Sequence, residues 1–199
     1  MKNIPELRFS EFSGEWVEKR LGEVGKIVTG TTPSTKNKKY WNGNILFVTP
    51  LDIQANKYIY DTNRKISEEG LKKTKIAPKG SVLFVCIGST IGKVAIVNQN
   101  VGFNQQINSI FSKKYNNEFL YYALLKKNKK IASLAGEQAV PIINKTQFSG
   151  IKIHLPPTFE EQQKIASFLS SIDEKIELNE QKLTKLKEYK KGLLQKMFV

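Results

Sequence analysis

A heptad pattern of apolar residues runs through the last forty residues of the chain and constrains the fold more than any other feature. From Ile165 onward, apolar side chains recur at alternating steps of four and three residues, with charged residues on the other faces. This spacing is typical of a helix that packs along one seam against another helix. At 1.5 Å per residue, a helix from Glu160 to Val199 would be roughly 60 Å long, too long to bury its whole stripe on one small domain. The pattern therefore predicts a helix that needs a partner helix.

The seam is the predicted dimer interface, and eight of its ten positions are apolar. Asn179 and Lys190 interrupt it, and a polar residue at such a position commonly fixes register or partner choice at some cost in stability. The alternative is a long exposed helix whose stripe docks only on its own domain, but the pattern continues to the last residues. The ten positions are Ile165, Leu169, Ile172, Ile176, Asn179, Leu183, Leu186, Lys190, Leu193 and Met197.

The segment Pro156–Pro157 separates this helix from the rest of the chain. Consecutive prolines favour extended backbone and end the preceding strand. Thr158, followed three residues later by Glu161, has the spacing of a helix-initiating capping box. We therefore expect two domains, residues 1–157 and residues 158–199.

The first domain is rich in short β-branched or aromatic runs bounded by Gly, Asn, Pro and Ser, which are typical of strands. One helix is expected from about Asn117 to Leu134, where apolar residues share one face. The predicted fold class is α+β: a mixed, loop-rich β-sheet domain with a few helices, followed by one long C-terminal coiled-coil helix. The predicted strands are Ile45–Val48, Val82–Ile87, Val94–Val97, Ile107–Phe111 and Ile151–Leu155, with a hairpin joining the second and third.

Positive charge is concentrated in the first domain. The chain has 32 Lys and Arg against 18 Asp and Glu, a formal net charge of +14. Residues 160–199 contain eight lysines and seven acidic residues, so residues 1–159, with 24 basic and 11 acidic residues, carry +13. Such an excess favours a polyanionic partner, and the phosphate backbone of nucleic acid is the first candidate.

Four segments of the basic domain combine hydroxyl, amide and basic side chains that suit contacts with phosphates and base edges. For any one of these residues an ordinary surface position is the simpler interpretation, and Trp41, beside the first segment, is more often a core residue than a base contact. As a group they are the best candidate DNA-binding surface. The candidates are Thr31, Thr32, Ser34, Lys36, Lys38, Lys39, Tyr40, Ser89, Thr90, Lys93, Asn104, Gln105, Gln106, Asn144 and Lys145.

No motif supports catalysis, a metal site or a cofactor site. One cysteine and one histidine cannot supply the four ligands of a structural zinc site. Cys86 is expected to be buried, and His154 to be a solvent-facing strand residue. Gly88–Lys93 has three residues between its glycines where a phosphate-binding loop needs four. The longest apolar runs, such as Val82–Ile87, are far shorter than the roughly 20 residues that cross a bilayer, so we expect a cytoplasmic protein.

A series of short motifs occurs in a characteristic order along nearly the whole chain. They are Gly30-x-Thr32-Pro33-Ser34, Tyr40-Trp41-x-Gly43, Ile91-Gly92-Lys93-Val94-Ala95, Asn104-Gln105, Leu155-Pro156-Pro157, Glu161-Gln162, Asp173 and Lys191-Gly192-Leu193-Leu194-Gln195. In this combination the sequence resembles the specificity subunit of type I restriction-modification enzymes. The resemblance implies a target-recognition domain that reads one part of a bipartite DNA site, followed by a helical spacer.

The usual subunit of that family carries two recognition domains and two antiparallel spacer helices, whereas this sequence has one of each. It therefore looks like a half-length subunit; a natural half-subunit, a split or shuffled gene product and a fragment all stay open. A homodimer joined through antiparallel C-terminal helices would restore two recognition domains around a two-fold axis, suited to an inverted-repeat site. Pairing with another half-subunit is also open, and the bases read are not encoded in the resemblance.

The resemblance also implies that the chain is not an enzyme. In the family, modification subunits methylate adenine with S-adenosylmethionine, and a restriction subunit translocates and cleaves DNA; both assemble on the specificity subunit. The main alternative is a stand-alone dimeric DNA-binding regulator. A self-contained adenine methyltransferase with an unusual Leu155–Thr158 motif and an RNA-binding protein are less favoured, because the sequence has no glycine-rich cofactor loop and its aromatic residues are scattered.

Overall fold

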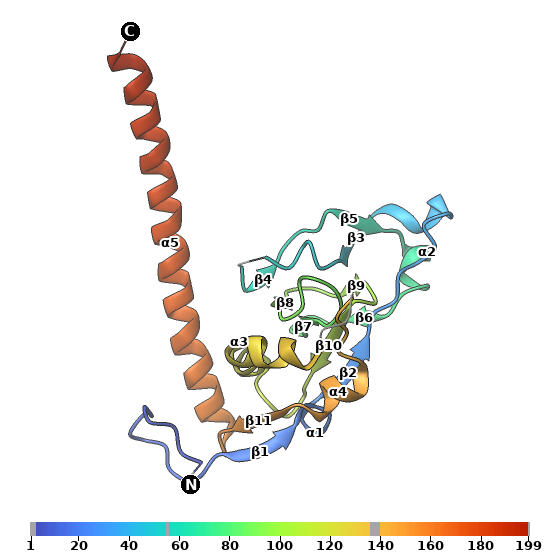
Figure 1. Ribbon diagram of the computed structural model, residues 1–199, viewed down its shortest axis with the longest axis vertical. Helices are drawn as coiled ribbons and strands as arrows, with labels where there is room; N and C mark the ends of the chain where they lie inside the picture. Colours follow the sequence, from blue (N-terminus) through green and yellow to red (C-terminus); the bar gives the residue numbers. More distant parts are fainter. Residues whose placement is uncertain (1–2, 55, 136–139, 199) are drawn as a thin grey trace. The chain divides into compact units, whose positions relative to one another are not determined.

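The computed structural model describes residues 3–54, 56–135 and 140–198 (Figure 1). The chain forms two compact units, residues 1–163 and residues 164–199, and the first turn of the long C-terminal helix belongs to the first unit. The strands are β1 (Val17–Arg20), β2 (Lys26–Thr29), β3 (Trp41–Val48), β4 (Tyr58–Ile59), β5 (Arg64–Ile66), β6 (Ile76–Ala77), β7 (Val82–Val85), β8 (Val94–Val97), β9 (Val101–Phe103), β10 (Ile107–Phe111) and β11 (Lys152–Leu155). The α-helices are α1 (Leu21–Val24), α2 (Glu68–Leu71), α3 (Asn117–Ala132), α4 (Lys145–Gly150) and α5 (Phe159–Met197), and the 3-10 turns are η1 (Lys38–Tyr40) and η2 (Ser133–Ala135).

Three sheets organise the first unit. The five-stranded sheet has the order β2-β10-β7-β8-β4 and the four-stranded sheet the order β5-β3-β9-β6. Both sheets are mixed, because β4 pairs with β8 and β3 pairs with β9 in parallel while the other pairs are antiparallel. Strands β1 and β11 form a separate antiparallel pair that brings Val17 opposite Leu155.

The hydrophobic core lies between the two larger sheets. Its members come from seven different strands and from the loop after β3, so that it joins the two sheets into one body. The cluster contains Leu46, Val48, Ile53, Ile59, Ala77, Leu83, Val85, Ala95, Val97, Val101, Phe103 and Ile107.

Strand β7 is covered on both faces, which explains why it has no polar alternation. Leu83 and Val85 belong to the core between the sheets. Phe84 points to the other face and packs against Phe148 of α4 with ring centroids 5.3 Å apart. Strands buried on both faces read as continuous apolar runs rather than as alternating patterns.

The predicted α+β class is confirmed, and all five predicted strands are present: β8 and β10 have the predicted bounds, and β3, β7 and β11 each differ at one end. β3 begins four residues earlier, at Trp41, and β7 ends at Val85 rather than Ile87 because the chain turns into a loop with Gly88 at a φ of 93°. The predicted hairpin is confirmed, since β7 and β8 pair antiparallel. Helix α3 ends at Ala132, two residues before the predicted end, and continues as the 3-10 turn η2.

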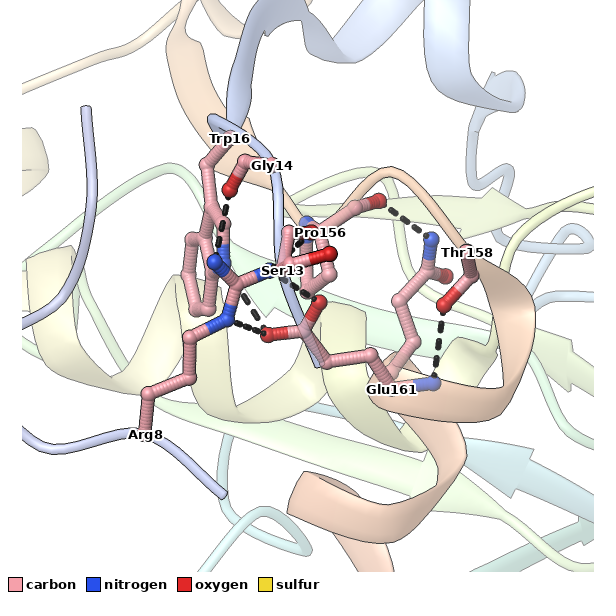
Figure 2. A network of polar contacts seen from close by, with 8 residues as sticks. Arg8, Ser13, Gly14, Trp16, Pro156, Thr158 and Glu161 are labelled. Atoms are coloured by element: carbon pink, nitrogen blue, oxygen red, sulfur yellow. Dashed lines mark hydrogen bonds and ion pairs between the residues drawn. The ribbon is translucent and has the colours of Figure 1, made fainter. Parts of the chain in front are cut away.

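The start of α5 confirms half of the predicted capping box. Thr158 Oγ1 accepts a hydrogen bond from the Glu161 backbone N–H at 3.3 Å. The Glu161 side chain does not turn back to Thr158. Its carboxylate instead accepts hydrogen bonds from the Arg8 guanidinium and from Trp16 Nε1 (Figure 2). The predicted reciprocal bond is therefore wrong, because the carboxylate binds the half-buried guanidinium of Arg8 in place of the local backbone donor.

The second unit is the remainder of α5, described as far as Met197, with Phe198 beyond its end and Val199 outside the described residues. Six of the ten seam residues are exposed large apolar side chains: Ile172, Ile176, Leu183, Leu186, Leu193 and Met197. The long helix is thus confirmed, and six of its eight apolar seam positions are exposed, while Ile165 and Leu169 are half-buried. None of the described helices is long and apolar enough to cross a membrane.

Candidate nucleic-acid interface

The first candidate segment, residues 31–40, is held in place where the chain leaves β2. The Gly30 N–H donates to the Ile107 carbonyl at 3.1 Å and the Thr31 N–H to the Phe103 carbonyl at 2.9 Å. A Cβ on Gly30 would collide with the carbonyl oxygens of Phe103 and Asn104, so the close approach needs a glycine. The loop and the turn between β9 and β10 therefore form one continuous piece of surface.

Side chains strengthen this contact. Asn104 Nδ2 donates to Thr32 Oγ1 at 3.2 Å, and Thr32 Oγ1 donates to Gln105 Oε1. Asn104 Oδ1 accepts from the Gln106 backbone N–H at 2.7 Å. Both ends of the Asn104 amide are therefore engaged within the protein, while Gln105 and Thr31 are exposed. The structure brings together Thr31, Thr32, Asn104, Gln105 and Gln106, as a shared recognition surface requires.

The loop after β7 lies beside this turn. The Cys86 N–H donates to the Gln106 carbonyl at 2.7 Å, and Gln106 Nε2 lies 3.5 Å from the position that a Cβ on Gly88 would take. Ser89 is exposed and Thr90 half-buried in this loop. Two of the three predicted residues here extend the surface.

Lys93, the third, lies elsewhere. It lines a shallow cavity of about 330 Å³ together with Tyr121 and Asn128 of α3. Its backbone carbonyl accepts from the Val85 N–H at 2.9 Å, which starts the β7–β8 ladder. The structure therefore does not place Lys93 with the turn between β9 and β10.

The segment that carries Asn144 and Lys145 is bound to the other side of the same loop. The Gly88 N–H donates to the Pro141 carbonyl at 3.0 Å, and the Ile143 N–H to the Cys86 carbonyl at 2.8 Å. Asn144 is the N-cap of α4: its Oδ1 accepts from the Gln147 N–H and its own N–H donates to Gln147 Oε1, both at 2.9 Å. Asn followed three residues later by Gln is a usual sequence signal of a capping box, so this cap is a structural role for Asn144 that its local sequence indicates.

The far end of the first segment turns toward β5 instead. The Lys39 and Tyr40 carbonyls accept from the Ser67 hydroxyl and N–H at 2.5 and 3.1 Å. Ser34 offers its carbonyl to Trp41 Nε1 at 3.1 Å. The predicted residues Lys36, Lys38 and Lys39 are exposed here. The candidates other than Lys93 therefore do not form one compact patch. They form a strip, with the β9–β10 turn and the loops beside it at one end and residues 36–40 at the other.

The charge of the strip is uncompensated. In the described part of the chain, Arg8, Lys57, Lys65, Lys152 and His154 each lie within ion-pair distance of an acidic side chain. No ion pair of the described residues involves the predicted lysines, which are Lys36, Lys38, Lys39, Lys93 and Lys145. Lys36, Lys38, Lys39 and Lys145 are also exposed, so their charges face solvent.

The two residues considered for other chemistry have structural roles. Cys86 is 2% exposed, and burial raises the pKa of its thiol to about 12, opposed in part by the hydrogen bond from Asn108 Nδ2 at 3.1 Å. A thiol with so high a pKa is a poor nucleophile at neutral pH. His154 is half-exposed in β11, with Nε2 at 3.8 Å from Glu18 Oε2. Among the described residues, no group of three or more His, Cys, Asp or Glu is placed to hold a metal ion.

Two residues near the strip were not singled out from the sequence. The Thr74 hydroxyl donates to the Thr31 carbonyl and so fixes the first segment from a distant loop. Arg64 of β5 stacks its guanidinium on the ring of Trp41. Neither has a local sequence signal, because each depends on a pairing between distant segments.

Comparison with known sequences decides the family. The type I restriction modification DNA specificity domain matches residues 13–188, most of the chain. The chain belongs to this family. Among curated specificity subunits of type I restriction enzymes, the MjaIX subunit of Methanocaldococcus jannaschii is 35% identical over 170 residues, covering 82% of this chain and 39% of its own length. The HindI subunit of Haemophilus influenzae is 33% identical over 147 residues, covering 71% of this chain and 32% of its own length.

Solved structures of type I restriction-modification subunits share the fold. A chain from a type I R-M system superposes with a TM-score of 0.69 at 20% identity, covering 92% of this chain and 45% of that one. The HsdS subunit from Thermoanaerobacter tengcongensis gives a TM-score of 0.65 at 20% identity, covering 86% of this chain and 40% of that one. The chain thus spans less than half the length of these specificity subunits, and the resemblance noted from its motifs is confirmed.

Proposed function

We propose that this chain is a DNA-recognition subunit of a type I restriction-modification system and reads one half of a bipartite site. The observation that carries the proposal is the strip of hydroxyl and amide groups with unpaired lysines on a specificity-family domain. In this proposal residues 1–157 bind double-stranded DNA and residues 158–199 form the spacer and dimerisation region. Lysines on phosphates supply affinity, and side chains in the groove select the sequence.

The proposed mechanism needs no active site in this chain. It binds and orients the DNA, while modification subunits, and through them a restriction subunit, perform the chemistry. Because the target is the host's DNA, we place its action in the cytoplasm. This division of labour matches the names of its relatives, which are specificity subunits of restriction enzymes.

We further propose that two copies pair through antiparallel α5 helices. Two observations support this arrangement. The exposed apolar seam extends from Ile172 to Met197, and an apolar surface of this length is typical of a protein–protein interface rather than of a solvent-exposed helix. The relatives are more than twice as long as the part matched here, so a second copy would supply a second recognition domain. A two-fold protein then pairs with a palindromic bipartite site.

The decisive experiment is methylome sequencing of the host with and without the gene. The proposal requires adenine methylation at one bipartite motif to disappear on deletion and to return on complementation with the full chain. An unchanged methylation pattern in a host that expresses the modification subunits would overturn it. Copurification separates the alternative: a stand-alone DNA-binding regulator binds DNA without retaining a modification subunit.

A further inference from the structure

The edge formed by β3 and β5 carries an immobilised arginine. The Arg64 guanidinium carbon lies 3.7 Å from the centroid of the Trp41 ring, so the two planar groups are stacked. The ring itself is fixed by its Nε1 bond to the Ser34 carbonyl and by an edge contact with Phe47, with centroids 5.3 Å apart. Arg64 is exposed, and no ion pair of the described chain involves it. Its donors therefore face solvent from a fixed position.

The backbone around Trp41 is irregular in a way that redirects this edge. The register between β3 and β5 shifts between Trp41 and Ile45, which is a β-bulge or comparable irregularity. Asn42, within it, has a φ of 60°, and it is the one non-glycine residue of the described chain with a positive φ. A Cβ on Gly43 would collide with the Ile66 carbonyl, so the strands approach closely there. Bulges of this kind re-aim side chains beside functional sites.

The stack borders a shallow pocket of about 390 Å³. Polar side chains surround it, and two hydrogen bonds hold one of them: the Asn63 backbone N–H and its Nδ2 both donate to Asp52 Oδ1 at 2.8 Å. The Arg64 carbonyl accepts from Thr62 Oγ1 at 2.6 Å, which fixes the strand beneath the stack. The pocket is lined by Trp41, Asn42, Gly43, Thr62, Asn63, Arg64 and Lys65.

From this arrangement we infer that Arg64, positioned by Trp41, reads a guanine of the target half-site in the major groove. The inference rests on the proposed function and extends it to one residue and one base. A guanidinium presents two parallel N–H donors that match the O6 and N7 acceptors of guanine, the commonest specific protein contact to a base. Stacking removes much of the rotamer freedom that the side chain would otherwise lose on binding.

The test uses the full chain assembled with the modification subunits of its host. Selection from a random duplex library first defines the bound sequence. Each guanine of that sequence is then replaced by 7-deazaguanine, which lacks the N7 acceptor. We expect one position at which this replacement weakens binding of the unmodified protein by roughly 10- to 100-fold. With Arg64→Ala, the same replacement should change affinity less than about twofold, because the contact is already lost.

Three variants complete the test. Arg64→Lys keeps the charge but lacks the planar fork that stacks on Trp41, so it should weaken the guanine preference while it keeps binding to unrelated DNA. Trp41→Phe retains an aromatic ring but loses the bond to Ser34, and should weaken the preference in part. The matched control is Lys36→Ala, an exposed lysine of the neighbouring loop, which should weaken all duplexes alike. Thermal unfolding confirms that each variant is folded.

Two results would overturn the inference and leave the proposed function standing. One is an Arg64→Ala protein that still selects the same guanine. The other is a selected half-site that contains no guanine. If the unmodified assembly selects no sequence at all, the proposed function itself fails, and the role of Arg64 falls with it.

Discussion

The carboxylate of Glu161 accepts hydrogen bonds from Arg8 Nε and Nη2, each at 2.7 Å, across 153 positions of sequence (Figure 2). The Glu161 side chain is 1% exposed and the Arg8 side chain 12%. Arg8 also donates to the carbonyls of Ser13 and Gly14 at 2.8 and 2.6 Å, and Trp16 Nε1 donates to Glu161 at 3.2 Å. The hydrogen bonds to the carboxylate raise the pKa of Arg8 above its ordinary value. The N-terminal segment is thereby attached to the first turn of α5.

We predict that Glu161→Ala destabilises the fold strongly. The substitution leaves the Arg8 guanidinium and the Trp16 N–H without their acceptor, and breaking one side of a buried pair is costly. Urea unfolding followed by circular dichroism measures the effect as a lower midpoint. Glu18→Ala is the control, because its pair with Lys152 exposes 41% and 57% of the two side chains. Equal midpoints for the two variants would contradict the structural role of the buried pair.

Gly30→Ala should also lower stability, by about 1–3 kcal/mol, because the added methyl group forces the loop away from Phe103 and Asn104. Gly192 in α5 offers the matched control, since a Cβ there meets no atom within 4 Å beyond its chain neighbours and the backbone of its own helix. Gly192→Ala should stabilise the helix by about 0.5–1 kcal/mol through the better helix propensity of alanine. Chemical unfolding of both variants measures the change in the free energy of unfolding. An unchanged value for Gly30→Ala would contradict the close approach of Gly30 to the carbonyls of Phe103 and Asn104.

Asn144 and Lys145 are adjacent, yet they should respond to substitution in different ways. Asn144→Ala should cost about 1 kcal/mol of stability through loss of the N-cap, while Asn144→Ser keeps the cap and should restore it. Lys145→Ala should leave stability unchanged and reduce the slope of log affinity against log salt by about one. Unfolding and DNA-binding titrations at several salt concentrations separate these roles. A DNA-binding defect in Asn144→Ser would assign its amide to base contact as well.

The seam of α5 allows a comparison between two leucines of equal exposure. Leu183 lies on the seam and Leu178 lies off it, and both side chains are 51% exposed. If two copies pair as proposed, Leu183→Glu, alone or with Leu186→Glu, should convert the dimer to a monomer, whereas Leu178→Glu should not. Light scattering at micromolar concentration measures the mass. A monomeric unmodified protein, or dissociation by both substitutions alike, would count against pairing through this seam.

Cys86 should resist alkylation in the native state by two or more orders of magnitude relative to a free thiol at pH 8, because the reactive thiolate is suppressed by burial. Its raised pKa also makes a prediction for alkaline unfolding. The thiol ionises near pH 8.5 in the unfolded chain and near pH 12 in the folded one. The free energy of unfolding should therefore be unaffected by this thiol below pH 8.5 and should fall as the pH rises from 8.5 toward 12, because ionisation then stabilises the unfolded chain. Labelling kinetics with iodoacetamide, with and without urea, test the predicted protection of the thiol. Rapid labelling of the native protein would contradict the buried position of Cys86.

The sequence predicted those elements that local pattern determines. The β-branched runs of β7 and β8, with a glycine-bounded loop between them, predict a hairpin, and the structure has it. The apolar seam similarly predicts the long helix. Parallel pairing of β3 with β9 and of β4 with β8 has no local signature, because it depends on which distant segments meet in the core.

The same distinction applies to the candidate site. Loop composition identified Thr32 and Gln105, and the structure brings their side chains together. Loop composition could not identify Arg64, because the position of the Arg64 side chain over Trp41 follows from the irregular register of β3 and β5. Glu161 illustrates the opposite case: its local spacing indicates a capping box, and a residue 153 positions away takes the carboxylate instead.

The pairing of β1 with β11 has a consequence for how such proteins change. Val17 lies opposite Leu155, so the polypeptide enters and leaves the sheet domain at neighbouring points. A domain with adjacent entry and exit can be inserted into, or exchanged between, longer polypeptides without disturbing its interior. Exchange of the polypeptide between these two junctions would then move the sheets together with the core between them, and would leave the rest of the longer chain in place.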